Sequence, residues 1–219
     1  MAVGETVSVA VISANFGGYA CPKAHHMPQR VETTFRHFVD YDIPSRERTL
    51  LPRMAAKVPK MFGWELLPGH DAYIWLDAPF RLSSTESVAW WLEQLGDHDV
   101  AVFQHPTRHS IHKEASDLRI NVRKQDAYSV DKYFGEDLAG IVSLIEADAD
   151  FIDNHLYAAG AFCYRPTRAT KQAMRDWWWY VSRYHVNDQL SLPFAIRHCS
   201  VQVIRENIYH ASHLVFGGA

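Results

Sequence analysis

The stretch Asp71-Ala72-Tyr73-Ile74-Trp75-Leu76-Asp77 is a short, almost wholly apolar run that ends in a carboxylate and is followed by Ala78-Pro79. A run of this length, bounded by turn residues, is typical of a buried strand. An earlier run at Val7–Ala14 has the same character and stops at Asn15-Phe16-Gly17-Gly18-Tyr19. Both runs predict inner strands of a sheet, each of which delivers a polar residue to the sheet edge.

Strands and helices alternate outward from these two runs. Further strands are predicted at 35–41, 99–104, 157–164 and 201–205, and helices at 53–62, from Ser84, over about 111–145, after Thr167 and from Asn187. This alternation predicts an α/β fold, and no segment resembles a domain linker, so we expect one domain over residues 1–219. Since such sheets bind ligands beyond the carboxyl ends of their strands, Asn15, Asp77 and His105 are expected at the binding edge.

The composition excludes several classes of protein. The chain has 219 residues, 47% hydrophobic and 21% charged, with a net charge of −3, so a disordered chain and a generally basic nucleic-acid binder are excluded. One local basic track remains, formed by Arg108, His109, His112, Lys113, Arg119, Arg123 and Lys124. The three scattered cysteines are no disulfide framework, and no apolar run reaches membrane length, so we expect a protein of the reducing cytoplasm.

Two sets of charged residues are candidates for chemistry. Asp77, at a strand end, suits a nucleotide ribose or a divalent cation, although a turn or a cap explains it equally well. Arg53, Lys57 and Lys60 are spaced by four and three residues, which places them on one helical face that suits a diphosphate. The alternative for these three is a solvated basic face.

Three other segments carry weaker signals. The glycines of 15–19 let the backbone approach a ligand, and Tyr19 suits a base, but an ordinary turn also fits. Asp188, in Asn187-Asp188-Gln189, is by default a helix cap. His105, His109 and His112 fit no common zinc spacing, and a substrate contact by His105 or His109 with Arg108 is the favoured interpretation.

Taken in order, five segments resemble one known family. They are VISANFGGY (11–19), RMAAKVPKMFGWELLPGHDAYIWLDAPFRL (53–82), FQHPTRHSIHKEA (103–115), LYAAGAFCYRP (156–166) and WWWYVSRYHVNDQLSLPFAI (177–196). This order resembles the TOD1/MUCI70 glycosyltransferase-like domain. The most specific pieces are Y-x-I-W-L-D and D-Q-L-S, and the chain departs from the family pattern at Asn187, where the family usually has Arg.

The resemblance implies a GT-A-like domain with a mixed, mostly parallel sheet flanked by helices. It implies a hexosyl- or pentosyltransferase that moves a sugar from a nucleotide-diphospho-sugar, foremost a UDP-sugar, to a hydroxyl acceptor. A glycan and a hydroxymethylated base in phage DNA are the acceptors considered. Because no anchor is visible, a bacterial or phage form in the cytoplasm is expected.

The resemblance also implies roles for individual residues. Asp77 falls at the first carboxylate of a D-x-D element that holds Mn²⁺ or Mg²⁺, with His213 or His210 completing the site, but Pro79 replaces the second carboxylate. Asp188 and Asp77 are the catalytic candidates. The donor candidates are Asn15, Phe16, Gly17, Tyr19, Arg53, Lys57 and Lys60, and the acceptor or sugar candidates are His105, Arg108, His109 and Gln189.

Two other functions stay open from the sequence. A metal-dependent hydrolase is supported by the three histidines alone, because the chain has no G-x-S-x-G element. A non-catalytic sugar-binding module is suggested by the missing second carboxylate at Pro79.

Overall fold

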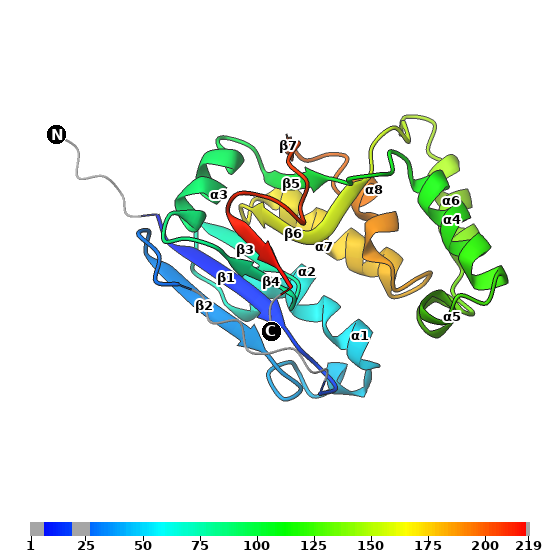
Figure 1. Ribbon diagram of the computed structural model, residues 1–219, viewed down its shortest axis with the longest axis horizontal. Coiled ribbons are helices and arrows are strands. Elements are labelled where there is room, and N and C mark those ends of the chain that lie inside the picture. Colours follow the sequence, from blue (N-terminus) through cyan, green and yellow to red (C-terminus); the bar gives the residue numbers. More distant parts are fainter. Residues whose placement is uncertain (1–6, 19–26, 218–219) are drawn as a thin grey trace.

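The computed structural model describes residues 7–18 and 27–217. Within these residues a six-stranded sheet has the order β2-β1-β3-β6-β5-β7 (Figure 1). Its strands are β1 (Val9–Ala14), β2 (Thr33–Phe38), β3 (Ala72–Leu76), β5 (Val100–Gln104), β6 (Tyr157–Tyr164) and β7 (Val201–Ile204). Only β6 runs antiparallel to its neighbours in this sheet. The predicted α/β fold with a mixed, mainly parallel sheet is therefore confirmed.

The inner strands are apolar because helices cover both faces of the sheet. Every residue of β1 and β3 is buried. Helices α2 (Lys57–Leu66) and α7 (Arg168–Val181) pack on one face with Ile12 and Trp75, while α3 (Ser87–Leu95) packs on the other. Successive side chains of β3 therefore alternate between the two cores, and Asp77, two residues after Trp75, continues the face of α2.

The helical region after β5 is broken into three pieces. These are α4 (Ile111–Arg123), α5 (Ala127–Tyr133) and α6 (Leu138–Glu146), gathered at one end of the molecule (Figure 1). Gln125 (φ 58°) and Gly135 (φ 82°) take left-handed conformations between them, and Asp126 and Asp137 cap the helices that follow.

Several short elements were not predicted as such. The strands β4 (Phe80–Leu82) and β8 (Leu214–Phe216) form a separate antiparallel pair, too short for any periodicity to show in the sequence. The predicted helix at 53–62 is two helices, α1 (Pro52–Ala55) and α2. The remaining short helices are η1 (Glu47–Thr49), η2 (Asp188–Leu190) and α8 (Leu192–Ala195). No helix among the described residues is both long and apolar enough to cross a bilayer.

Candidate active site

A cavity of about 550 Å³ lies at the carboxyl ends of β1 and β3. This is the edge of an α/β sheet where ligands bind, and the volume is in the range of small-molecule sites. The cavity is lined by Ala14, Asn15, Phe16, Pro52, Arg53, Ala56, Lys57, Trp75, Asp77, Ala78, Pro79, Tyr128, Lys132 and Val186. The fold thus brings five of the predicted donor or catalytic residues, Asn15, Phe16, Arg53, Lys57 and Asp77, to one cavity.

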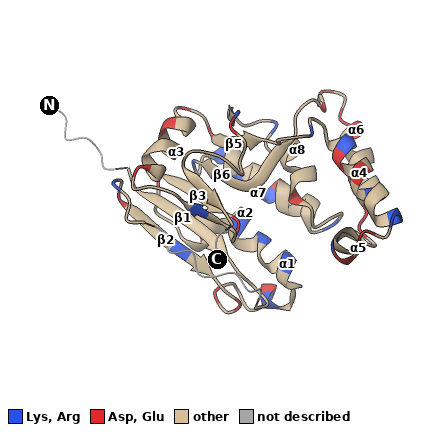
Figure 2. Ribbon diagram, viewed as in Figure 1, with Lys and Arg blue, Asp and Glu red and all other residues tan. Residues whose placement is uncertain are grey.

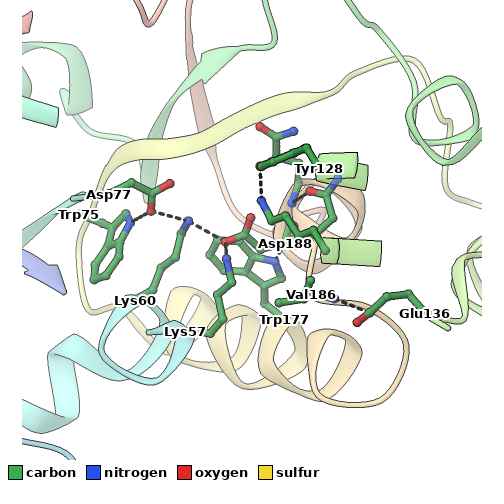
Figure 3. Close-up of polar contacts among 12 residues, drawn as sticks. Lys57, Lys60, Trp75, Asp77, Tyr128, Glu136, Trp177, Val186 and Asp188 are labelled. Atoms are coloured by element: carbon green, nitrogen blue, oxygen red, sulfur yellow. Dashed lines mark hydrogen bonds and ion pairs between the residues drawn. The ribbon is translucent and has the colours of Figure 1, made fainter. Parts of the chain in front are cut away.

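A cluster of two lysines and two aspartates adjoins this cavity, which Lys57 and Asp77 line (Figure 3). The Nζ atoms of Lys57 and Lys60 both lie 2.6 Å from Oδ2 of Asp188. Lys60 lies between the two carboxylates, because its Nζ is also 3.1 Å from Oδ1 of Asp77. That oxygen accepts a second hydrogen bond, of 2.7 Å, from Nε1 of Trp75. The cluster therefore joins α2, the end of β3 and η2.

Burial and charge act against each other within the cluster. Burial alone would raise the pKa of Asp188, but the adjacent Lys57 and Lys60 ammonium groups outweigh it and hold that pKa well below its usual range. Burial also lowers the pKa of Lys57, as does the charge of Lys60. Burial would lower the pKa of Lys60 too, yet the facing Asp188 and Asp77 carboxylates raise it. Lys60 is therefore the firmly charged lysine, whereas an anion entering the cavity would further stabilise the charge on Lys57.

Two expectations about this cluster are wrong. A solvated basic face is excluded, because the side chains of Lys57 and Lys60 are only 16% and 1% exposed. Asp188 does not cap η2, since the preceding Asn187 accepts the Gln189 N–H at 3.3 Å. Arg53 does not share a helical face with the two lysines, because it lies on α1. It pairs instead with Asp131, which precedes Lys132 on α5.

The predicted acceptor residues lie around α4. Nη1 of Arg108 is 2.7 Å from Glu114, which accepts a 3.0 Å hydrogen bond from Asn187. Nδ1 of His105 accepts the Arg108 N–H at 3.1 Å, and burial lowers the pKa of this imidazole. This chain of contacts ends at Asn187, next to the partly exposed Gln189, so the His-Pro segment is linked to the residue before Asp188.

Other predicted site residues are not brought to the cavity. His213 stacks on Trp90 of α3, which packs on the opposite face of the sheet from Asp77. Among residues 7–18 and 27–217, no three His, Cys, Asp or Glu side chains are grouped to hold a metal ion. Gly17 (φ 71°) forms a turn in which its N–H binds Asp40 and a side chain would collide with Pro52. Tyr19 lies outside the described residues.

The three histidines of the hydrolase hypothesis have separate partners. His109 contacts Gln104, and His112 lies between Asp153 and Glu146, whose hydrogen bonds raise its pKa. His105 is bound to the backbone of its own loop. The structure thus removes the observation on which the hydrolase hypothesis rested.

Sequence reasoning missed Tyr128, Lys132 and His185. The first two line the cavity from α5, and their i,i+4 spacing gave no indication of this in the sequence. His185 is buried, and neither of its ring nitrogens has a hydrogen-bond partner among the described residues. Burial lowers its pKa to about 4, although Asp188 acts in the opposite direction.

His185 should make the protein less stable as the pH falls. Between its unfolded pKa of about 6.5 and its folded pKa of about 4, the unfolded chain binds a proton that the folded chain excludes. The stability that comes from keeping His185 neutral is therefore fully present above pH about 6.5. We expect the free energy of unfolding to fall by about 2 kcal/mol between pH 7 and pH 5. Urea unfolding of the wild type and of His185→Leu at both pH values measures this difference. Exposed His198→Leu is the matched control, and an unchanged pH dependence in His185→Leu would contradict the assignment.

Comparison with known proteins gives a family and two similar structures. The family model described as TOD1/MUCI70, glycosyltransferase-like domain, matches residues 49–212. No curated protein matches the chain. The apo structure of mouse xyloside xylosyltransferase 1 is 7% identical with a TM-score of 0.46, covering 90% of this chain and 85% of that one. A glycosyltransferase involved in glycosylation of the major capsid of PBCV-1 is 7% identical with a TM-score of 0.45, covering 95% and 91%. Because this match covers more than half of the chain, the chain belongs to the TOD1/MUCI70 glycosyltransferase-like domain family.

Proposed function

We propose that this protein transfers a hexosyl or pentosyl group from a nucleotide-diphospho-sugar, foremost a UDP-sugar, to a hydroxyl group of a glycan. The observation that carries the proposal is the convergence on one cavity of the loop after β1, helices α1 and α2, and the end of β3. These four elements hold Asn15, Arg53, Lys57 and Asp77, and the last three residues fall within the residues that match the family.

The positions of these residues suggest a separate role for each of them in binding the donor. Asn15 and Phe16 would contact the nucleotide, while Arg53 and Lys57 would bind the diphosphate through charge-assisted hydrogen bonds. Asp77 would face the ribose or the transferred sugar. Catalysis would consist of orienting the acceptor hydroxyl and stabilising the charge that develops on the leaving diphosphate. A role for Asp188 at the reacting sugar stays a prediction, because its carboxylate binds Lys57 and Lys60.

The described residues do not fit the Mn²⁺ or Mg²⁺ that the family resemblance implies. Such ions prefer several oxygen ligands, yet Asp77 is the one carboxylate among the described residues lining the cavity. Its Oδ1 is already bound by Lys60 and Trp75, and Pro79 stands where a second carboxylate would be needed. The Lys60 ammonium would also repel a cation at this oxygen.

A glycan is favoured as acceptor over a modified base in DNA. Part of the basic track along α4 is neutralised within the protein: Arg108, just before the helix, binds Glu114 and Asp117, and Lys113 also binds Asp117. Figure 2 shows charges of both signs along this helix. Binding to DNA depends on cations that are available to phosphates. An acceptor assay that includes hydroxymethylated DNA tests this choice directly.

The proposal is tested by thermal shift against a panel of UDP-, GDP- and other nucleotide sugars, followed by release of the nucleotide diphosphate with candidate glycans. We expect stabilisation by one donor class and turnover with an acceptor. Absence of stabilisation by every donor, with or without Mn²⁺, would contradict the proposal. Binding without turnover on a true acceptor would instead favour a non-catalytic sugar-binding module.

Lys57→Met should weaken donor binding more than it weakens folding. A hydrogen bond to a charged group contributes about 1.5–3 kcal/mol, so the donor KM should rise about tenfold or more. Asp188 would keep Lys60 as its partner, which limits the loss of stability. Steady-state kinetics and urea unfolding of the same variant measure both effects. A donor KM equal to that of the wild type would exclude Lys57 from the diphosphate site.

A further inference from the structure

Helix α5 supplies one wall of the cavity through Tyr128 and Lys132. Nζ of Lys132 donates a 2.8 Å hydrogen bond to the hydroxyl of Tyr128, one turn earlier on the helix. The same ammonium lies 5.2 Å and 5.3 Å from the ring centroids of Tyr128 and Tyr133. These hydroxyl and cation–π contacts hold the ammonium in place without neutralising its charge.

The other cations around the cavity already have carboxylate partners. Arg53 pairs with Asp131, while Lys57 and Lys60 share Asp188 and Lys60 also binds Asp77. Among the residues that the structure describes, Lys132 forms no ion pair with a carboxylate. Although burial disfavours its charge, the neighbouring tyrosines raise the pKa of Lys132 above its usual value, so the ammonium persists at neutral pH. Four cationic side chains (Arg53, Lys57, Lys60 and Lys132) thus face three carboxylates (Asp77, Asp131 and Asp188), and the excess positive charge lies on Lys132.

An excess ammonium on a cavity wall suits an anion that enters the cavity. Lys57 lines the same cavity from α2, and a nearby phosphate would replace part of the solvation that burial has removed from it. The Arg53–Asp131 pair is no barrier to this, because Asp131 is 68% exposed and exposed ion pairs contribute little to stability. By contrast, one of the two carboxylate oxygens of Asp77, Oδ1, is already bound by Lys60.

We propose that Lys132 binds the donor diphosphate from α5 while Lys57 binds it from α2, so that ammonium groups neutralise it without a divalent cation. This inference rests on the proposed function, since it concerns the diphosphate of the same donor. It assigns a binding role to α5, a segment in which the sequence pattern gave no indication of one.

Isothermal titration calorimetry of UDP and of inorganic pyrophosphate against the full chain tests the proposal, in excess EDTA and in excess Mn²⁺. The Kd of UDP should agree within about threefold between the two conditions, and Lys132→Met should raise it about tenfold or more. Lys124→Met removes the same charge from an exposed position at the end of α4 and should leave the Kd unchanged. Methionine keeps the length of the lysine side chain, and urea unfolding of each variant checks the fold.

The possible outcomes separate this inference from the proposed function. UDP that binds only with Mn²⁺, or about tenfold more tightly with it, overturns the inference while leaving the transferase proposal standing. A Lys132→Met variant that binds UDP and pyrophosphate like the wild type overturns it as well. Pyrophosphate binding without UDP binding, lost in Lys132→Met, supports the lysine site and contradicts a uridine donor. Absence of binding by both probes in both conditions overturns the inference and contradicts a UDP-sugar donor, while the panel of other nucleotide sugars still tests the transferase proposal.

Discussion

Asp188→Asn should destabilise the protein by about 3–5 kcal/mol, the usual cost of removing one partner from a buried ion pair. Its carboxylate is the shared partner of Lys57 and Lys60, and its side chain is only 10% exposed. The amide keeps the shape but leaves two close ammonium groups facing a neutral residue. Urea unfolding at pH 7 measures the loss as a shift of the transition midpoint.

Two further variants make this result specific. Asp150→Asn makes the same chemical change at an exposed position and should stay within about 0.5 kcal/mol of the wild type. Adding Lys57→Met to Asp188→Asn removes one of the stranded charges, so the double variant should be less destabilised than the sum of the single variants. An Asp188→Asn protein as stable as the wild type would show that the ion-pair cluster does not stabilise the fold.

The stability of the cluster should also depend on pH through Asp188. Because the folded pKa of Asp188 lies below its unfolded value of about 3.9, its contribution is present above that pH and lost as the pH falls through the folded pKa. This acid loss lies below the range in which His185 titrates. The two effects can therefore be separated in one series of unfolding measurements.

Asp77→Asn should lower kcat/KM for sugar transfer by about 10²-fold or more, the usual scale for one preorganised polar group at a reacting centre. Its carboxylate lines the cavity and fixes the Lys60 ammonium at 3.1 Å. Stability should change little, since the side chain is 41% exposed and the amide oxygen still accepts the Trp75 N–H. Initial rates with saturating acceptor, together with the melting temperature, measure both.

Asp71→Asn is the matched control for this variant, because Asp71 flanks the opposite end of the same strand and binds the N–H of Ser8. We expect its transfer rate to equal that of the wild type. If Lys132 and Lys57 neutralise the donor, excess Mn²⁺ should not restore activity to Asp77→Asn. Near-normal kcat/KM in Asp77→Asn would remove the residue from the site.

The main elements of the fold are predictable because their signals are local. The apolar runs of β1 and β3 predict that both strands are buried. The apolar stripe through Ala173, Met174 and Trp177 predicts the buried face of α7. Because β1 and β3 are parallel neighbours, Asn15 and Asp77, which follow them, lie at the same edge of the sheet. The sequence alone thus determined the strands of the main sheet, the shared edge of Asn15 and Asp77, and the family.

Only the tertiary structure decided which side chains meet at that edge. Lys57 and Asp188 are 131 residues apart in the chain, and no local pattern shows that α2 and η2 cross there. Lys60, which the sequence spacing placed on a solvated face, is buried between two carboxylate partners, Asp188 of η2 and Asp77 after β3. Lys132 reaches the cavity from α5, a short helix that left-handed residues at Gln125 and Gly135 separate from α4 and α6. Strand and helix patterns depend on neighbours a few residues away, whereas charge pairing depends on packing between distant segments.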